Sequence, residues 1–223
     1  MATSAPAQPY EPYGKGAAAN AIYDLLFCDN LDGFRSNSDS EPPAWEALLF
    51  EPAPDSAQLA ALANDTAAES RVRALAFNRL RDLGSKPPKG VLFGVVVEVP
   101  LDKGLDALRA YADGRVRYIN QTGKMAIVEP DGMPDANGAA KRLVELARPV
   151  IARIGLWDKP RLPPPARPNV RLTFIVSDGL YFGEGPFQVL QRDALAGPLI
   201  QEASVLLKLV VDTALAGDAP AGA

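Results

Sequence analysis

The segment Ala112–Lys124, ADGRVRYINQTGK, gathers several cationic side chains in a short stretch of the sequence. Arg115 and Arg117 are two residues apart, and Lys124 follows after a second glycine turn. Paired guanidinium groups suit bidentate binding of a carboxylate or another anion. The segment therefore predicts an anion or carboxylate clamp. The alternative is a half-exposed sheet whose outer face is simply polar.

The glycine turns of this segment determine how its side chains are arranged. Asp113-Gly114 is a dipeptide that a tight hairpin turn with positive φ prefers. With a two-residue loop at this dipeptide, Arg109 lies opposite Tyr118, and Arg115 and Arg117 share the other face of the hairpin. We therefore expect Arg115 and Arg117 to point away from Tyr118, and Arg109 to stack on tyrosine.

A second candidate site is the segment 177–187, SDGLYFGEGPF. Backbone amides at a junction between a strand and a helix can bind an anion, and Tyr181 and Glu184 are candidates to line a pocket there. The glycines lack the lysine and the spacing of a phosphate-binding loop, so they do not specify a nucleotide. The alternative is a β-bulge and a tight corner whose aromatic side chains belong to the core.

Glu98 lies in the otherwise apolar run VLFGVVVEVP. A carboxyl group buried in such a strand has a raised pKa and can serve as a general acid or base. The alternative is that position 98 marks the end of the strand, where the side chain reaches solvent. No second acid has a spacing that suits it to work with Glu98, so a paired-carboxylate mechanism is not predicted.

A proline-rich linker, GLWDKPRLPPPARPN, has five prolines in residues 155–169. Such a segment is extended over part of its length. It is either a docking segment for another protein or a rigid strap that crosses the domain with Trp157 as its anchor.

The chain of 223 residues contains no histidine. This excludes Ser-His-Asp and Cys-His nucleophiles, imidazole general bases and histidine-rich metal sites. The single cysteine, Cys28, excludes an intramolecular disulfide and a cysteine cluster for zinc or iron–sulfur ligation, and we interpret it as a small core residue on a helix. We predict no metal, no cofactor and no catalytic residue.

The net charge of −4 is unevenly distributed. Residues 24–55 carry eight acids against one base, Arg35. This balance argues against nucleic acid as a partner and predicts either a solvated face or a contact for a basic protein. The first sixteen residues lack a signal-peptide pattern, and no long apolar run occurs, so we expect a cytoplasmic protein that does not contact a membrane.

The N-terminal half of the chain shows helical spacing. We predict disordered tails at 1–16 and 217–223, and a helical N-terminal region at 17–86. Within that region a helical hairpin is expected, and Thr66 and Glu69 have the spacing of a capping box at the start of its second helix. The hairpin has the composition of one HEAT-type unit, but no second copy follows at the required period.

After SKPPKG the periodicity changes, and an α+β sheet domain is predicted over residues 90–216. It comprises a mostly antiparallel sheet of about six strands, an inserted helix and a long C-terminal helix. Pro149 is expected to kink or divide the inserted helix, and Gly197-Pro198 to interrupt the C-terminal one. The predicted segments are strands at about 91–100, 106–112, 115–120 and 124–129, a hairpin turning at Asp178-Gly179, and helices at about 139–154 and 195–215.

Three segments carry a resemblance to known proteins: NAIYDLLFCDNLDGF, GVVVEVPLDKGLDALRAYADGRVRYINQTGK and RLTFIVSDGLYFGEGPF. Together they are similar to a group of uncharacterised bacterial cytosolic proteins without an assigned activity. The resemblance covers most of the chain, and it implies no catalytic residue.

These observations predict a non-enzymatic bacterial adaptor or accessory subunit that binds another protein through its sheet-and-hairpin surface or its acidic N-terminal helices. One alternative is a protein that binds a small anionic ligand, or an enzyme that works without histidine. In that case Arg115, Arg117, Tyr181 and Glu184 surround the ligand. A second alternative is an antitoxin-like or immunity-like protein whose acidic segment covers a basic partner.

Overall fold

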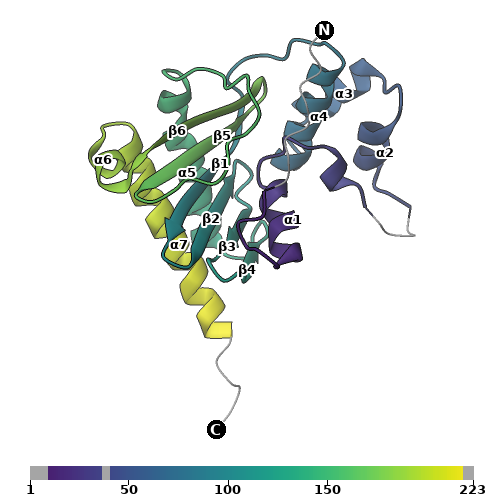
Figure 1. Ribbon diagram of the computed structural model, residues 1–223. Helices are drawn as coiled ribbons and strands as arrows, with labels where there is room; N and C mark the ends of the chain where they lie inside the picture. Colours follow the sequence, from purple (N-terminus) through teal and green to yellow (C-terminus); the bar gives the residue numbers. More distant parts are fainter. Residues whose placement is uncertain (1–9, 37–40, 218–223) are drawn as a thin grey trace.

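The computed structural model describes residues 10–36 and 41–217, and its centre is a six-stranded antiparallel sheet (Figure 1). The strands lie in the order β4-β3-β2-β1-β5-β6, and every neighbouring pair is antiparallel. Their bounds are Leu92–Leu101 for β1, Gly104–Tyr111 for β2, Val116–Ile119 for β3, Met125–Val128 for β4, Asn169–Val176 for β5 and Gly179–Pro186 for β6.

Helices cover both faces of this sheet, which confirms the predicted α+β class with N-terminal helices, an inserted helix and a long C-terminal helix. Before the sheet come α1 (Ala17–Leu25), the 3₁₀ turn η1 (Asp32–Phe34), α2 (Ala44–Phe50), α3 (Ser56–Asn64) and α4 (Ser70–Asp82). The inserted helix is α5 (Pro134–Ile151), and α6 (Phe187–Arg192) and α7 (Ala196–Gly217) follow β6.

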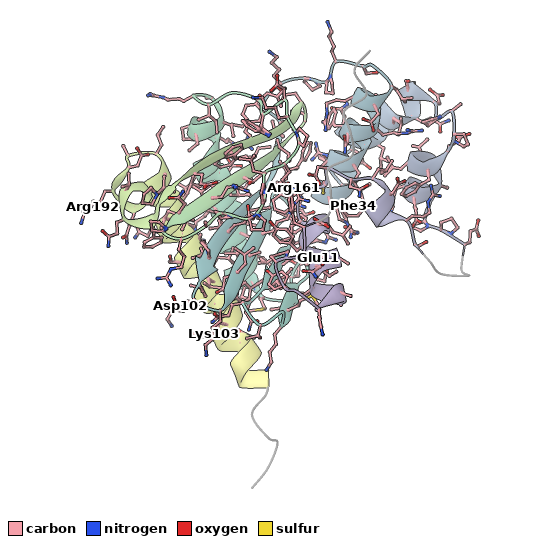
Figure 2. All side chains as sticks on the ribbon, in the orientation of Figure 1. Glu11, Phe34, Asp102, Lys103, Arg161 and Arg192 are labelled. Atoms are coloured by element: carbon pink, nitrogen blue, oxygen red, sulfur yellow. The ribbon has the colours of Figure 1, made fainter. Side chains whose placement is uncertain are left out.

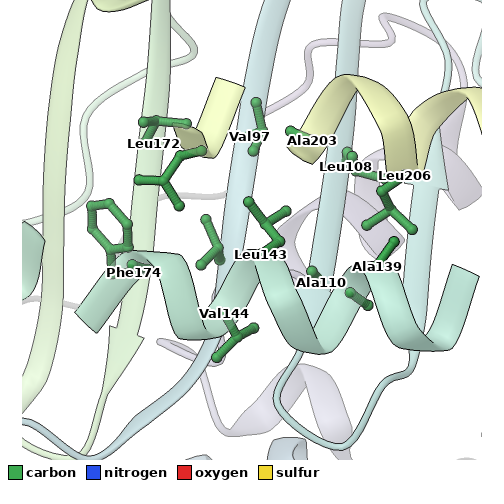
Figure 3. Close-up of a cluster of buried hydrophobic side chains, with 14 of the residues drawn as sticks. Val97, Leu108, Ala110, Ala139, Leu143, Val144, Leu172, Phe174, Ala203 and Leu206 are labelled. Atoms are coloured by element: carbon green, nitrogen blue, oxygen red, sulfur yellow. The ribbon is translucent and has the colours of Figure 1, made fainter. Parts of the chain in front are cut away.

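One face of the sheet, here called the α5/α7 face, packs against those two helices (Figure 3). Helix α5 presents four fully buried alanines to the strands, and the small side chains allow the helix to lie close to the sheet: Ala136, Ala139, Ala140 and Ala147. Leu143 fills the space between them against Val97 and Leu108. Burying such a leucine contributes roughly 1.5–3 kcal/mol to folding.

The opposite face, here called the α1/α4 face, shares a hydrophobic core with the N-terminal helices. Phe93 and Val96 of β1 pack there with Phe77 of α4 and Tyr23 of α1. Both faces of β1 are therefore covered, which explains why its sequence is a nearly continuous apolar run. The predicted helical region and the predicted sheet domain share this core.

The hairpin of β2 and β3 differs from the prediction in its register. Its loop has three residues, Ala112–Gly114, because Tyr111 pairs with Arg115, and Gly114 takes a φ of +93°. Arg109 therefore lies opposite Arg117, not opposite Tyr118. The predicted stacking of Arg109 on tyrosine is confirmed, but the ring is that of Tyr111, 4.0 Å from the guanidinium carbon.

Helix α4 begins later than the predicted capping box. Its first residue is Ser70, and Glu69 at the N-cap makes no side-chain capping bond. The cap comes instead from the distant β2–β3 turn: Asp113 Oδ2 accepts a hydrogen bond of 2.8 Å from the Ser70 N–H, and Ser70 Oγ accepts one of 3.0 Å from the Asp113 N–H.

Other predicted boundaries also shift. Helix α5 begins at Pro134, and Pro149 lies inside its last turn without dividing it. Gly197-Pro198 lies in the first turn of α7, where a missing proline N–H costs no hydrogen bond, so α7 is not interrupted. The β5–β6 turn is one residue earlier than predicted, because Val176 pairs with Gly179.

The disordered tail predicted at residues 1–16 extends too far, because the residues from Tyr10 onward make specific contacts. Tyr10 donates a hydrogen bond to the Arg161 carbonyl oxygen (2.7 Å), and the Tyr13 N–H donates one to Asn20 Oδ1 (2.9 Å). Residues 1–9 and 218–223 of the predicted tails lie outside the described residues. In the part of the chain that the structure describes, no helix is long and apolar enough to cross a membrane.

Candidate functional site

Arg115 and Arg117 lie on one face of the hairpin, away from Tyr118, as predicted. That face belongs to the α1/α4 side of the sheet, and the two side chains share one carboxylate there. Glu129 Oε2 accepts a hydrogen bond from Arg115 Nε at 2.9 Å, and its Oε1 accepts one from Arg117 Nη2 at 2.6 Å. Arg115 also contacts Asp113 at 2.9 Å and Glu69 at 3.4 Å. The predicted clamp is therefore occupied by carboxylates of the protein itself.

The pKa of Glu129 reflects this arrangement. Partial burial alone raises the pKa, but the charges and hydrogen bonds of Arg117 and Arg115 outweigh it and lower the pKa of the carboxyl group. An external anion has to displace a carboxylate that both guanidinium groups hold.

The other predicted site residues lie elsewhere. Lys124 is exposed in the β3–β4 turn. Tyr181 packs into the α5/α7 core, and its hydroxyl donates to Asp178 Oδ2 at 2.9 Å. Glu184 lies on the opposite face of β6, where it contacts Arg171. The structure thus brings Arg115 and Arg117 together and keeps Lys124, Tyr181 and Glu184 apart from them.

A row of charged side chains crosses three strands of the α1/α4 face. Glu98 of β1 pairs with Arg171 of β5, which in turn pairs with Glu184 of β6. Arg171 Nη2 lies 2.7 Å from Glu184 Oε2, and Arg171 Nη1 lies 3.9 Å from Glu98 Oε2. Glu98 and Arg171 are 0% and 4% exposed, so this end of the row is part of the interior, whereas Glu184 lies at the surface.

Glu98 is buried, so the first of the two alternatives predicted for it, a carboxyl group inside the strand, is confirmed. Its Oε1 accepts a hydrogen bond of 2.6 Å from the hydroxyl of Tyr23, and its Oε2 has no hydrogen-bond partner among the described residues. Burial raises the pKa of Glu98, and the Tyr23 hydrogen bond and the charge of Arg171 oppose that rise. Burial and the neighbouring Glu98 likewise raise the pKa of Tyr23. The pair can hold a proton, but it has no access to solvent.

Arg161 connects the proline linker to the N-terminal helices (Figure 2). Its guanidinium group binds Asp24 at 2.6 Å and Asp29 at 2.9 Å, and it stacks 4.0 Å above the ring of Phe27. The linker also binds the sheet, since the backbone N–H of Trp157 donates to the Leu180 carbonyl oxygen at 2.8 Å. These contacts match the predicted rigid strap anchored by Trp157.

Arg109 is a buried cation of a different kind. It is 0% exposed, donates to the carbonyl oxygens of Leu25 and Leu26, and lies 3.2 Å from Cys28 Sγ. Among the described residues no carboxylate forms an ion pair with it. Cys28 is a buried core residue as predicted, but it follows α1 with a φ of +51° and is not helical.

The acidic segment 24–55 uses several of its carboxylates inside the fold. Asp24 and Asp29 bind Arg161, Glu46 accepts a hydrogen bond from the Ser36 N–H, and Asp55 caps α3. Asp39 lies outside the described residues. Asp24, Asp29 and Glu46 are therefore engaged inside the fold, whereas Asp55 caps its helix and stays exposed.

An open cleft of about 490 Å³ lies where the end of α4, the strap and the β5–β6 turn meet. Arg81, Asp82, Lys159 and Asp178 are among the side chains that line it. Burial lowers the pKa of Arg81, whose Nη1 donates to the Ser177 carbonyl oxygen at 2.6 Å, and burial raises the pKa of Asp82. The volume lies within the range of small-molecule sites, and the lining has mixed charge.

The outer edge of β4 is a different kind of surface, which combines apolar side chains with open backbone. Met125 is 44% exposed and Ile127 is 59% exposed. β4 hydrogen-bonds to β3 alone, because it is the last strand of the sheet. At the other end of the sheet, β6 carries Glu184, ends at Pro186 and is bridged by Trp157, which are features that protect an edge strand.

Sequence reasoning missed Tyr23 and Arg171, and it considered Arg161 only as a flanking residue of the proline linker. Their partners are distant in the sequence, and only the strand order and the path of the strap bring them together. Among residues 10–36 and 41–217, no group of three or more acidic or cysteine side chains is placed to hold a metal ion. No family model, curated protein or solved structure matches this chain.

Proposed function

We propose that this protein is a non-enzymatic adaptor or accessory subunit that acts by protein–protein interaction, and that it binds an extended segment of its partner along the outer edge of β4. The observation that carries the proposal is the combination of unpaired backbone with the exposed side chains of Met125 and Ile127. Strand addition uses backbone hydrogen bonds for affinity and alternate side chains for specificity.

The state of the charged groups supports this choice over the alternatives. An anionic ligand has to compete with Glu129 for Arg115 and Arg117. An immunity-like role requires free acids in the N-terminal segment, where Asp24, Asp29 and Glu46 already have internal partners and the exposed acids are fewer than the composition suggests. The β4 edge has no such internal partner within the described chain.

Binding of a small polar ligand is the second candidate function, and the cleft of about 490 Å³ favours it. A ligand that binds the folded state alone raises the melting temperature by mass action. A thermal-shift screen of amines, carboxylates and phosphates tests this candidate, with Asp178→Asn as the variant that should lose any response.

The adaptor proposal is tested by capturing partners from an extract of the cells that make the protein. Wild type, Ile127→Asp and Val189→Asp serve as baits. Val189, on α6, is 61% exposed and therefore matches Ile127 in exposure on another surface. Chemical cross-linking before capture retains weakly bound partners, and we expect a cross-linked partner, either another protein or an untagged second copy, with wild type and Val189→Asp and its loss with Ile127→Asp. Equal capture by all three baits, or no partner with any of them, contradicts the proposal.

A further inference from the structure

The backbone groups that β4 leaves open belong to alternate residues. The Asn120 N–H donates to the Lys124 carbonyl oxygen at 2.9 Å and so begins the ladder between β3 and β4. In an antiparallel ladder, hydrogen-bonded and non-hydrogen-bonded pairs alternate. Ala126, opposite Tyr118, therefore turns its N–H and C=O toward β3. Met125 and Ile127 turn theirs outward, where no described residue hydrogen-bonds to them.

The same two residues carry the exposed apolar side chains of this edge. Met125 lies opposite Ile119, and Ile127 lies opposite Arg117, so both side chains project on the α1/α4 face. An occupant that satisfies the backbone of Met125 and Ile127 therefore also lies beside their side chains. It must supply an extended strand with two apolar side chains on that face.

We propose that this occupant is the β4 strand of a second copy of the chain, paired antiparallel about a two-fold axis that passes between the two Ala126 residues. This inference rests on the proposed function, since it names the partner for the same edge. Met125 of each copy then lies opposite Ile127 of the other. The open N–H and C=O groups of these residues meet as hydrogen-bonded pairs.

The edge is self-complementary in three respects. In this register the outward N–H and C=O groups of one copy face those of the other. The exposed apolar side chains of both copies lie on one continuous face. The residue that meets its own copy on the axis is Ala126, whose small side chain fits a non-hydrogen-bonded pair, in which Cα atoms approach to about 4.5 Å.

Charge also favours a second copy. Across the proposed interface, Arg117 of β3 pairs with Ile127 of β4, and Ile127 pairs with Met125 of the second copy. No like charges therefore lie opposite one another. Interfaces that bury less than about 1,200 Å² are weak or transient, and a strand of four residues contributes a small area. The dimer should therefore form reversibly and depend on protein concentration.

Sedimentation equilibrium between about 10 μM and about 1 mM measures this association in the range expected for weak interfaces. Wild type and Val189→Asp should show a dimer fraction that rises with concentration, and Ile127→Asp should stay monomeric. A wild type that is monomeric at every concentration overturns the inference. Dimerisation that Ile127→Asp does not reduce also overturns it. If such a monomer still captures another protein through Ile127, the proposed function stands without the second copy.

Disulfide cross-linking tests the register itself. Ala126→Cys places two thiols opposite each other on the axis, at a Cα separation that a disulfide spans. Lys124→Cys is the control. Position 124 lies opposite Val128 of the second copy, so the two thiols introduced at position 124 of the dimer would be far apart. Under mild oxidation, Ala126→Cys should form covalent dimers at least about tenfold faster than Lys124→Cys, since only the former has bridging geometry. Equal rates contradict the two-fold register, and wild type reports any contribution from Cys28.

Discussion

The hydroxyl of Tyr23 donates a hydrogen bond of 2.6 Å to Glu98, a carboxylate with no exposed surface. Tyr23→Phe removes this donor and leaves Glu98 Oε1 buried without it. We expect the free energy of unfolding to fall by about 1–3 kcal/mol, the cost of leaving a buried polar group unpaired. Urea unfolding measures the change.

Tyr13→Phe is the matched control for Tyr23→Phe, because the hydroxyl of Tyr13 is buried without a hydrogen-bond partner among the described residues. Its removal should leave the free energy of unfolding nearly unchanged. If the two variants lose equal stability, the hydrogen bond to Glu98 is not the cause.

The pH dependence of stability should reveal the buried carboxyl group of Glu98. Burial raises its pKa above the ordinary value of 4.5, against the opposing effects of Tyr23 and Arg171. As the pH rises above 4.5, the unfolded state ionises first and is favoured by at most about 1.4 kcal/mol per pH unit. Glu98→Gln removes this effect, so its stability relative to wild type should increase with pH. Denaturant titrations at several pH values check the sign.

Asp113→Asn should show the opposite trend. Burial alone raises the pKa of Asp113, but the hydrogen bonds from Ser70 and Arg115 outweigh it and lower the pKa below 3.8. The stability that ionised Asp113 contributes is present above 3.8 and is lost as the pH falls through the lowered pKa. The variant should therefore lose stability relative to wild type as the pH rises through that acidic window.

Arg161 and Arg109 are both buried, but only Arg161 has carboxylate partners. Arg161→Met leaves Asp24 and Asp29 without their cation and should lower the free energy of unfolding by about 3–5 kcal/mol. Arg109→Met removes a buried charge that has no paired carboxylate in the described chain, but it also leaves the Leu25 and Leu26 carbonyl oxygens without this donor, so the free energy of unfolding should fall by a smaller amount, about 1–3 kcal/mol. Thermal and urea unfolding of the two variants compare them, and an equal loss would refute the distinction.

Glu129 determines whether Arg115 and Arg117 can bind an external anion. Glu129→Gln removes the charge that both guanidinium groups share, so sulfate or phosphate should raise the melting temperature of this variant but not of wild type. Glu145→Gln breaks a single exposed pair with Arg148 and should show no response to the anions. A wild type that responds as strongly as Glu129→Gln would mean that the clamp is open in the native protein.

Local patterns were sufficient to predict the elements of the fold. The alternation of apolar residues and the Asp113-Gly114 dipeptide predict the β2–β3 hairpin, and the apolar run 91–100 predicts β1. The register failed because Asp113-Gly114 suits both a two-residue loop and a three-residue loop in which Gly114 takes positive φ. The same error in register placed Arg109 beside Tyr118 instead of Tyr111.

The candidate sites were harder to predict because their contacts are not local. Arg161 is 137 positions from Asp24, and Glu98 meets Arg171 only because β1 and β5 are neighbours in the sheet. Arg115 and Arg117 were correctly placed on one face. That Glu129 neutralises them depends on how β4 pairs with β3, which the spacing of the residues does not specify.

The reciprocal hydrogen bonds between Ser70 and Asp113 make the first turn of α4 and the β2–β3 turn stabilise each other. The first turn of α4 lacks a capping side chain at its N-cap residue and gains its cap only when the β2–β3 turn packs against it. Local helix formation in this segment is therefore tied to a contact between residues that are 43 positions apart. The helical hairpin and the sheet should acquire protection from hydrogen exchange together, as a single cooperative unit.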